Sequence, residues 1–199
     1  LYSLSQSDQM DVLINNLDTA TDAEILVNTT TTNAHTDVEI TAHPDGGYIS
    51  TWLSFETGKD TIMAQRYDAS GNPVGSVFTA NITTADGTSQ LLMPSVAILD
   101  SGDYAIAWTH QEPNSWTTSR VSFFLADGTL IPNSTDYIAL EDHGNAITAL
   151  SDGRYALTTV NGNSNQITMR LFDAQGADFG VFNLASVASW NWTHPDIVA

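Results

Sequence analysis

One short segment occurs three times in the sequence, and this repetition constrains the fold more than any other feature. Each copy places a tyrosine after a Gly-rich turn, and these tyrosines are Tyr48, Tyr104 and Tyr155. A second segment follows each tyrosine and aligns without gaps between the copies, at 62–75, 119–132 and 167–180. Self-similarity at a period of about 50 residues is typical of repeat architectures.

Each repeat predicts four short strands. In the second repeat, apolar residues alternate with small or polar ones, and tight-turn dipeptides such as Asp-Gly separate the runs. The predicted strands of this repeat are 94–99, 103–110, 120–125 and 136–140. Only 5–17 suggests a helix, and its apolar stripe is short.

The predicted fold is all-β, with repeated four-stranded antiparallel units. These units are either β-propeller-like blades or an open stacked β array, because a single blade cannot bury both faces alone. Residues 1–23 form an N-terminal segment of unknown role, and 24–199 form the β-repeat domain. Its repeats span about 33–84, 90–140 and 143–187, with the start of a further repeat at 193–199.

The two ends of the repeat domain resemble parts of a repeat. The segment 24–32 resembles the last strand of a preceding unit, and 193–199 resembles the first strand of a following one. Three blades are too few to close a propeller. We expect these end strands to pair with neighbouring repeats or with other copies of the chain, unless the chain is a piece of a longer array.

The composition excludes some partners. The formal net charge is -18, with 23 acidic and five basic residues. Such a chain repels phosphate backbones, so we predict no nucleic-acid partner, and no apolar run is long enough for membrane insertion. The chain has no cysteine, which fits a bacterial exported protein.

Carboxylates in the repeated turns are candidate metal ligands. Calcium takes six to eight oxygens, and turn carboxylates and carbonyls can supply them. The alternative is that each aspartate caps its own turn. The candidates for a possible Ca²⁺ cofactor are Asp45, Asp100, Asp103 and Asp152.

No catalytic motif stands out. The five histidines share no register between repeats and have no HExxH spacing, so we expect scattered surface histidines rather than zinc ligands. The chain has no GxSxG elbow, no P-loop and no GxGxxG. The sequence therefore predicts that the chain is not an enzyme, although carboxylates brought together from distant strands stay open.

Tryptophans divide into two groups. Trp52 and Trp108 lie at equivalent repeat positions, where packing between sheets is expected and an exposed platform for sugar rings is the alternative. Trp116 lies in a loop, and Trp190 and Trp192 precede the incomplete repeat. These three are the candidate ligand or partner contacts, and their alternative role is to cover the open end of the array.

The segments HPDGGYISTW, IMAQRYDASGNPVGSVFTANITT and MPSVAILDSGDYAIAW resemble repeats of very large exported bacterial proteins. Such repeats often share a chain with RTX-type calcium-binding nonapeptides, which are absent here. The resemblance implies a type-I-secreted surface protein or adhesin, extracellular or on the bacterial cell surface, with calcium as an associated ion.

Three function classes follow. The first expectation is a non-catalytic structural or adhesive repeat module of an exported bacterial protein, assembling through its incomplete end repeats. The alternatives are a glycan-binding, lectin-like propeller and part of a secreted polysaccharide-active enzyme. Glycan is thus a possible partner in two of the three classes.

Overall fold

The computed structural model describes residues 11–12, 25–27, 34–56, 58–81, 89–113, 117–132, 139–140, 142–161, 166–186 and 197. All regular secondary-structure elements in these ranges are β-strands. The first sheet holds β3 (His35–Ala42), β4 (Tyr48–Glu56), β5 (Lys59–Tyr67) and β6 (Pro73–Thr79). The second holds β7 (Gln90–Ile98), β8 (Tyr104–Gln111), β9 (Thr117–Phe124) and β10 (Ala139–Leu140). The third holds β11 (Asp142–Ala149), β12 (Tyr155–Asn161), β13 (Gln166–Phe172) and β14 (Asp178–Ser186).

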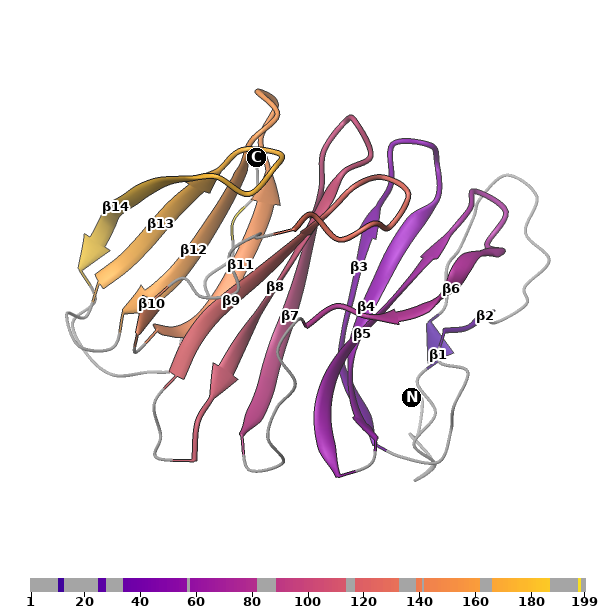
Figure 1. The fold of residues 1–199 in the computed structure, drawn as a ribbon, viewed down its shortest axis with the longest axis horizontal. Coiled ribbons are helices and arrows are strands. Elements are labelled where there is room, and N and C mark those ends of the chain that lie inside the picture. Colours follow the sequence, from indigo (N-terminus) through magenta and orange to yellow (C-terminus); the bar gives the residue numbers. More distant parts are fainter. Residues whose placement is uncertain are drawn as a thin grey trace, which may run out of the picture.

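Each of the three sheets is a sequential antiparallel meander of four strands (Figure 1). This confirms the all-β prediction, with one sheet per repeat. The boundaries of the second repeat differ by a few residues from the predicted ones, chiefly because β7 begins at Gln90 and β10 is two residues long. We call the three sheets blades 1, 2 and 3 in chain order.

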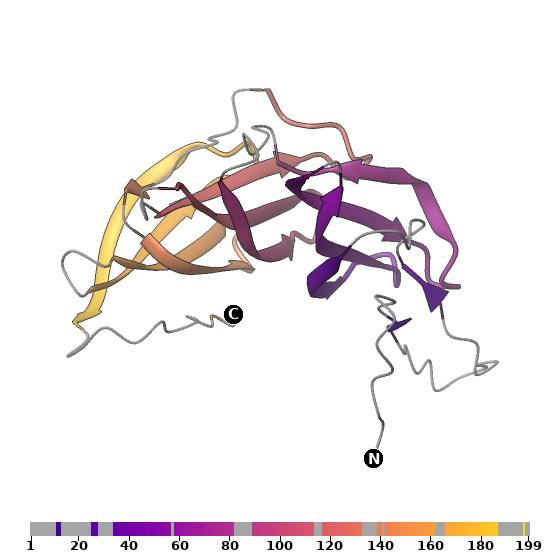
Figure 2. The same cartoon turned by 90° about the horizontal axis from the view of Figure 1, so that it is seen from below.

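The blades stand side by side in an arch (Figure 2). Their first strands, β3, β7 and β11, lie on the concave side, and their last strands lie on the convex side. The first strands contact one another, β3 with β7 and β7 with β11. This is the arrangement of propeller blades around part of an axis.

An aromatic pair joins β8 and β9 on the face of blade 2 that meets blade 1. Tyr104 stacks on Phe124 with ring centroids 5.0 Å apart and planes 12° apart. Phe78 of blade 1 lies across this pair, with ring centroids 5.5 Å from Phe124 and an angle of 59°. Tilted and stacked rings at these distances are the favoured aromatic geometries, so this contact holds the two sheets in one orientation.

A similar aromatic contact, made by a residue from a different strand, occurs at the interface between blades 2 and 3. Phe123 of β9 contacts Tyr155 and Phe172, a cross-strand pair of blade 3, at centroid distances of 5.5 and 5.3 Å. The turn of blade 3 follows the same ring closely, since a Cβ on Gly176 would lie 2.6 Å from the Phe123 ring. Gly176 also has a φ of +82°, so both space and backbone favour glycine there.

Both repeat-equivalent tryptophans are buried, which confirms packing between sheets and excludes an exposed platform. Trp108 lies in the apolar core between blades 1 and 2. Trp52 packs with Tyr48 and Tyr67 on the opposite face of blade 1, where Val27 covers them. The Tyr67 hydroxyl donates a hydrogen bond to the Val27 carbonyl oxygen.

The N-terminal segment departs from one expectation. The sequence predicts a helix over 5–17. The structure instead has a strand within this span, β1 (Asp11–Val12), which pairs antiparallel with β2 (Ile25–Leu26). The rest of that span lies outside the described residues. The last-strand-like segment thus pairs within its own chain at β2, and pairing between copies stays a prediction. No helix suited to crossing a bilayer occurs in the part of the chain that the structure describes.

Replacing Phe123 tests the interblade packing. Phe123→Ala removes a fully buried ring from the core of blades 2 and 3, so we expect a loss of about 3–5 kcal/mol in the free energy of unfolding. Leu125→Ala, two residues further on at a side chain 41% exposed, is the matched control and should change stability by less than about 0.5 kcal/mol. Urea unfolding monitored by tryptophan fluorescence measures both, and equal small losses would contradict the packing argument.

Candidate functional site

A strained β-bulge occurs at the same repeat position in all three first strands. Eleven residues before the anchor tyrosines, the backbone φ is positive at Asp37 (53°), Met93 (52°) and Gly144 (76°). The strand register shifts at each of these points. Glycine adopts this conformation freely, whereas a methionine there is unusual and carries a cost. Strain of this kind and β-bulges both concentrate at functional sites.

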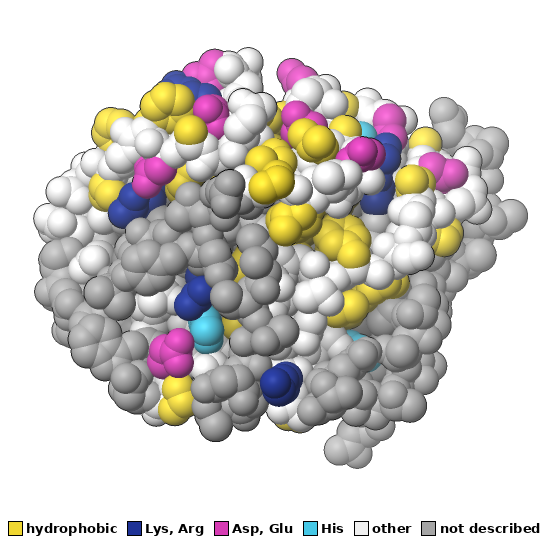
Figure 3. All heavy atoms as spheres, in the orientation of Figure 1, with side chains coloured by type: hydrophobic (Ala, Val, Ile, Leu, Met, Phe, Trp, Pro, Cys, Tyr) yellow, Lys and Arg dark blue, Asp and Glu magenta, His cyan; other side chains and the backbone are white. Residues whose placement is uncertain are grey.

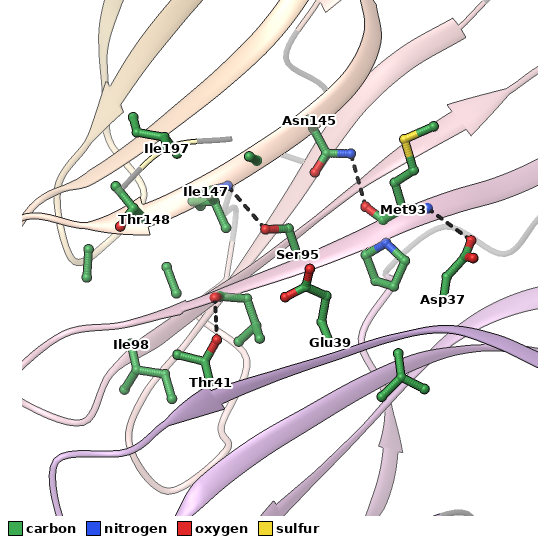
Figure 4. A pocket seen from close by; sticks show the side chains of 16 residues that line it. Asp37, Glu39, Thr41, Met93, Ser95, Ile98, Asn145, Ile147, Thr148 and Ile197 are labelled. Carbon is green, nitrogen blue, oxygen red and sulfur yellow. Dashed lines mark hydrogen bonds between the residues drawn. The ribbon is translucent and has the colours of Figure 1, made fainter. Parts of the chain in front are cut away.

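Side chains of neighbouring blades bind the backbone exposed by the central bulge. The Met93 N–H donates to Asp37 Oδ2 of β3 at 3.4 Å, and the Met93 carbonyl accepts from Asn145 Nδ2 of β11 at 3.2 Å (Figure 4). Two further bonds cross between first strands. Thr41 Oγ1 donates to the Val96 carbonyl, and the Ile147 N–H donates to Ser95 Oγ. Hydrogen bonds from side chains thus connect the three first strands.

A cavity of about 740 Å³ lies along these three first strands. Its walls come from β3, β7 and β11, with Ile197 on the β11 side. Asp37 and Glu39 supply two carboxylates from β3, and Asn145 faces them from β11 (Figure 4). The cavity therefore combines polar side chains with apolar lining residues such as Ile98 and Ile147, and small-molecule sites also combine the two kinds.

The Asn145 side chain, in this wall, has a hydrogen-bond acceptor without a partner. Its side-chain amide is buried, and its Nδ2 donates to the Met93 carbonyl and, at 3.0 Å, to Thr109 Oγ1. Its Oδ1 is buried without a hydrogen-bond partner. A buried acceptor left unpaired costs free energy.

The predicted turn aspartates are placed one per turn rather than in a cluster. Asp45 Oδ1 accepts the Gly47 N–H at 2.9 Å, and Asp45 also forms an ion pair with Arg66. Asp103 Oδ1 accepts the Ala126 N–H at 2.9 Å. Asp152 pairs with Arg154, and Asp100 is exposed at the tip of its turn. Asp45 and Asp152 accept from the backbone of their own turns, which matches the turn-capping alternative, whereas Asp103 binds a different turn.

Acidic side chains gather along the edge of the molecule that carries the turns, with arginines beside them (Figure 3). The hydrogen bond from the Gly47 N–H, together with Arg66 and His43, lowers the pKa of Asp45 below its ordinary value of 3.8. His43 Nδ1 lies 2.8 Å from Asp45 Oδ1. Among the described residues no group of three acidic, histidine or cysteine side chains could hold a metal ion. Calcium binding in these turns stays a prediction.

The histidine expectation is wrong for three of the five residues. His35, His43 and His110 are buried rather than scattered on the surface. His43 occupies a turn position where the equivalent residues are leucines, so it fills space between blade 1 and the Gly102 turn of blade 2. The side chain of His143, and all of His194, lie outside the described residues.

The three candidate contact tryptophans, Trp116, Trp190 and Trp192, also lie outside the described residues, so their role stays a prediction. The sequence interpretation missed Asp37, Glu39 and Asn145. A signal for the bulge existed in the alignment, because Gly144 shares its repeat position with Asp37 and Met93. A glycine within an otherwise strand-like run suggests a bulge.

No protein-family model and no curated protein sequence matches the chain. Solved structures do resemble it. A Hadza microbial sialidase, Hz136, matches with a TM-score of 0.52 and 11% identity, over 72% of this chain and 36% of the sialidase. A prolyl endopeptidase matches with a TM-score of 0.52 and 15% identity, over 98% of this chain and 28% of that protein. An α-L-arabinanase from Penicillium chrysogenum, solved with arabinobiose, has a TM-score of 0.48 and 12% identity, over 69% of this chain and 42% of its own.

The chain spans about a third of the length of the sialidase and the prolyl endopeptidase. At these identities the likeness shows the fold, which is a propeller-like all-β fold.

The comparisons correct the predicted function. The chain shares its architecture with enzymes, including the sialidase, so repetition without a catalytic motif is no argument for a non-catalytic adhesive module. The predictions of such a module and of a chain that is not an enzyme are therefore wrong.

The Asp45 contacts predict a pH dependence of stability. The pKa of Asp45 is lower in the folded chain than its ordinary value of 3.8, so its contribution is present above about pH 4 and disappears as the pH falls through the folded pKa. We expect Asp45→Asn to lower the urea midpoint at pH 6, and this difference to shrink progressively as the pH falls below 3.8. Asp100→Asn, in the equivalent turn of blade 2, is the control with little effect throughout the same pH series. A midpoint difference that does not shrink as the pH falls would refute the ionic explanation.

Proposed function

We propose that this chain is part of the propeller domain of a secreted, glycan-active enzyme and that it binds neutral polysaccharide in the first-strand cavity. The observation that carries the proposal is the convergence of two carboxylates, Asp37 and Glu39, on one cavity whose wall also includes Asn145. The sialidase likeness supports the same class, because that protein is a glycan-active enzyme of similar fold.

The cavity chemistry suits a ligand with many hydroxyl groups. Asp37 and Glu39 can accept hydrogen bonds from sugar hydroxyls. Ile147 and Ile98 line the cavity beside them and offer apolar surface for the C–H faces of a sugar ring. Sugars need both kinds of contact, and this wall supplies them together.

Charge selects among glycans. Neither lysine nor arginine occurs among the described residues that line the cavity, whereas two carboxylates do. The whole chain carries a formal net charge of -18. Sugars that bear carboxylate or sulfate groups would meet repulsion both at long range and in the cavity. Neutral pentose or hexose polymers are therefore the proposed ligand class.

Asp37 and Glu39 are the proposed carboxylate pair for hydrolysis. Enzymes that cleave glycosidic bonds generally use two carboxyl groups, one as proton donor and one as base or nucleophile. Both residues come from the bulged part of β3, and the bond from the Met93 N–H holds Asp37 in place. Export to the cell exterior completes the proposal, since polysaccharides are met there and the acidic, cysteine-free chain suits it.

Glu39→Gln tests the ligand site. We expect it to weaken binding of neutral oligosaccharides about ten- to hundredfold, the equivalent of a lost charge-assisted hydrogen bond. Asp127→Asn, at an exposed turn far from the cavity lining, is the matched control and should bind like the natural chain. Calorimetric titration against neutral and acidic oligosaccharides gives the affinities, and release of reducing ends gives turnover.

The outcomes separate the classes. The expected result is binding with turnover in the natural chain, and in Glu39→Gln weakened binding and no turnover. Binding without turnover would favour the lectin-like alternative over an enzyme. Preference for acidic oligosaccharides, or binding that Glu39→Gln leaves intact, would refute the assignment of this cavity.

A further inference from the structure

Blade 3 has an outward sheet face whose counterparts on blades 1 and 2 are interblade interfaces. On blade 1 this face carries Phe78, which pairs across the ladder with Ala64. On blade 3 the equivalent ladder position pairs Phe182 with Met169. The equivalence follows from the alignment of Tyr67 with Phe172, three residues beyond each partner in the sequence.

The two equivalent phenylalanines differ in their environment. Phe78 packs on the stacked Tyr104–Phe124 pair of the next blade. Phe182 has no ring contact among the described residues and is 44% exposed. Its strand also exposes Phe179, Val181 and Leu184. Val181 directly precedes Phe182 in the ladder and therefore points to the opposite face. Phe182 and, two residues further on, Leu184 are the exposed apolar side chains of the outward face, and exposed apolar surface of this kind marks an interaction site.

A second observation indicates what lies against this face. The segment 193–199 aligns without gaps with 92–98, which places Ile197 at the repeat position of Val96. Val96 is the first-strand residue whose carbonyl accepts from Thr41 of the preceding blade. Thr148 is the equivalent of Thr41, and Figure 4 shows Ile197 next to it. Ile197 thus lies where the fold would place the first strand of a further blade.

We propose that the outward face of blade 3 is an interface for a fourth blade of the same repeat type, whose Tyr/Phe cross-strand pair receives the ring of Phe182. The partner is defined by chemistry already present twice in the molecule: a ring from one blade lies tilted across an aromatic pair on the next. A second copy is a poorer occupant, because its Tyr48–Tyr67 pair is already covered by Val27. This inference does not depend on the glycan proposal.

The experiment extends the full chain by one blade. A copy of residues 99–140 is joined after Ala199, because Ala199 aligns with Ile98. The chain has no cysteine, so Phe182→Cys introduces a single thiol that reports on the face. Ser70→Cys, in an exposed turn of blade 1, is the labelling control. A matched extension, in which the copies of Tyr104 and Phe124 are replaced by serine, removes the proposed partner pair.

We expect maleimide labelling at position 182 to slow about tenfold or more in the extended chain, as burial requires, and to stay unchanged at position 70. The serine extension should restore fast labelling. In unlabelled protein, Phe182→Ala should lower the Tm of the extended chain by about 5 °C more than that of the natural chain. Equal labelling rates at position 182 with and without the extension would overturn the proposal. An added blade that circular dichroism shows to be unfolded would overturn it too, because the outward face of blade 3 would then not stabilise a neighbouring blade.

Discussion

The structure depends on the packing of an aromatic ring from one sheet across a cross-strand aromatic pair on the next. A four-stranded sheet with apolar side chains on both faces is unstable alone, so each blade needs a neighbour. Phe78 on Tyr104 and Phe124, and Phe123 on Tyr155 and Phe172, supply that contact at the two interfaces. The donor ring comes from different strands in the two cases, β6 and β9, whereas the receiving pair keeps its position. The cross-strand aromatic pair thus occupies the same repeat position at both interfaces, whereas the ring that packs on it does not.

This packing brings the first strands together and explains why the bulges are tolerated. A bulge leaves backbone groups without a ladder partner, and a positive φ at Asp37 or Met93 costs about 1–3 kcal/mol. The neighbouring blades supply the missing partners, since Asp37 and Asn145 bind the N–H and carbonyl of Met93. The strained positions are therefore stable only in the assembled array. The same residues line the cavity, so interblade cohesion and the proposed ligand site share one set of side chains.

Much of the fold follows from the sequence, because alternation and turn dipeptides are local signals. The four strands per repeat and the burial of Trp52 and Trp108 are of this kind. The cavity is not local: Asp37, Met93 and Asn145 are far apart in the chain and meet only when three sheets are stacked. Buried histidines escaped prediction for a related reason, since His43 fills a leucine position that is apolar only through its tertiary neighbours. The proposed site escaped prediction because the carboxylates of β3 belong to no linear motif.

A further blade on the outward face of blade 3 would also change the cavity. Ile197 lines the cavity and also occupies the position of a next blade's first strand. A blade placed on blade 3 would extend the row β3, β7, β11 by one strand and add its own bulge residue to the wall. A polar site made from successive first strands gains groups with every blade, so its chemistry is a property of the array rather than of any single repeat.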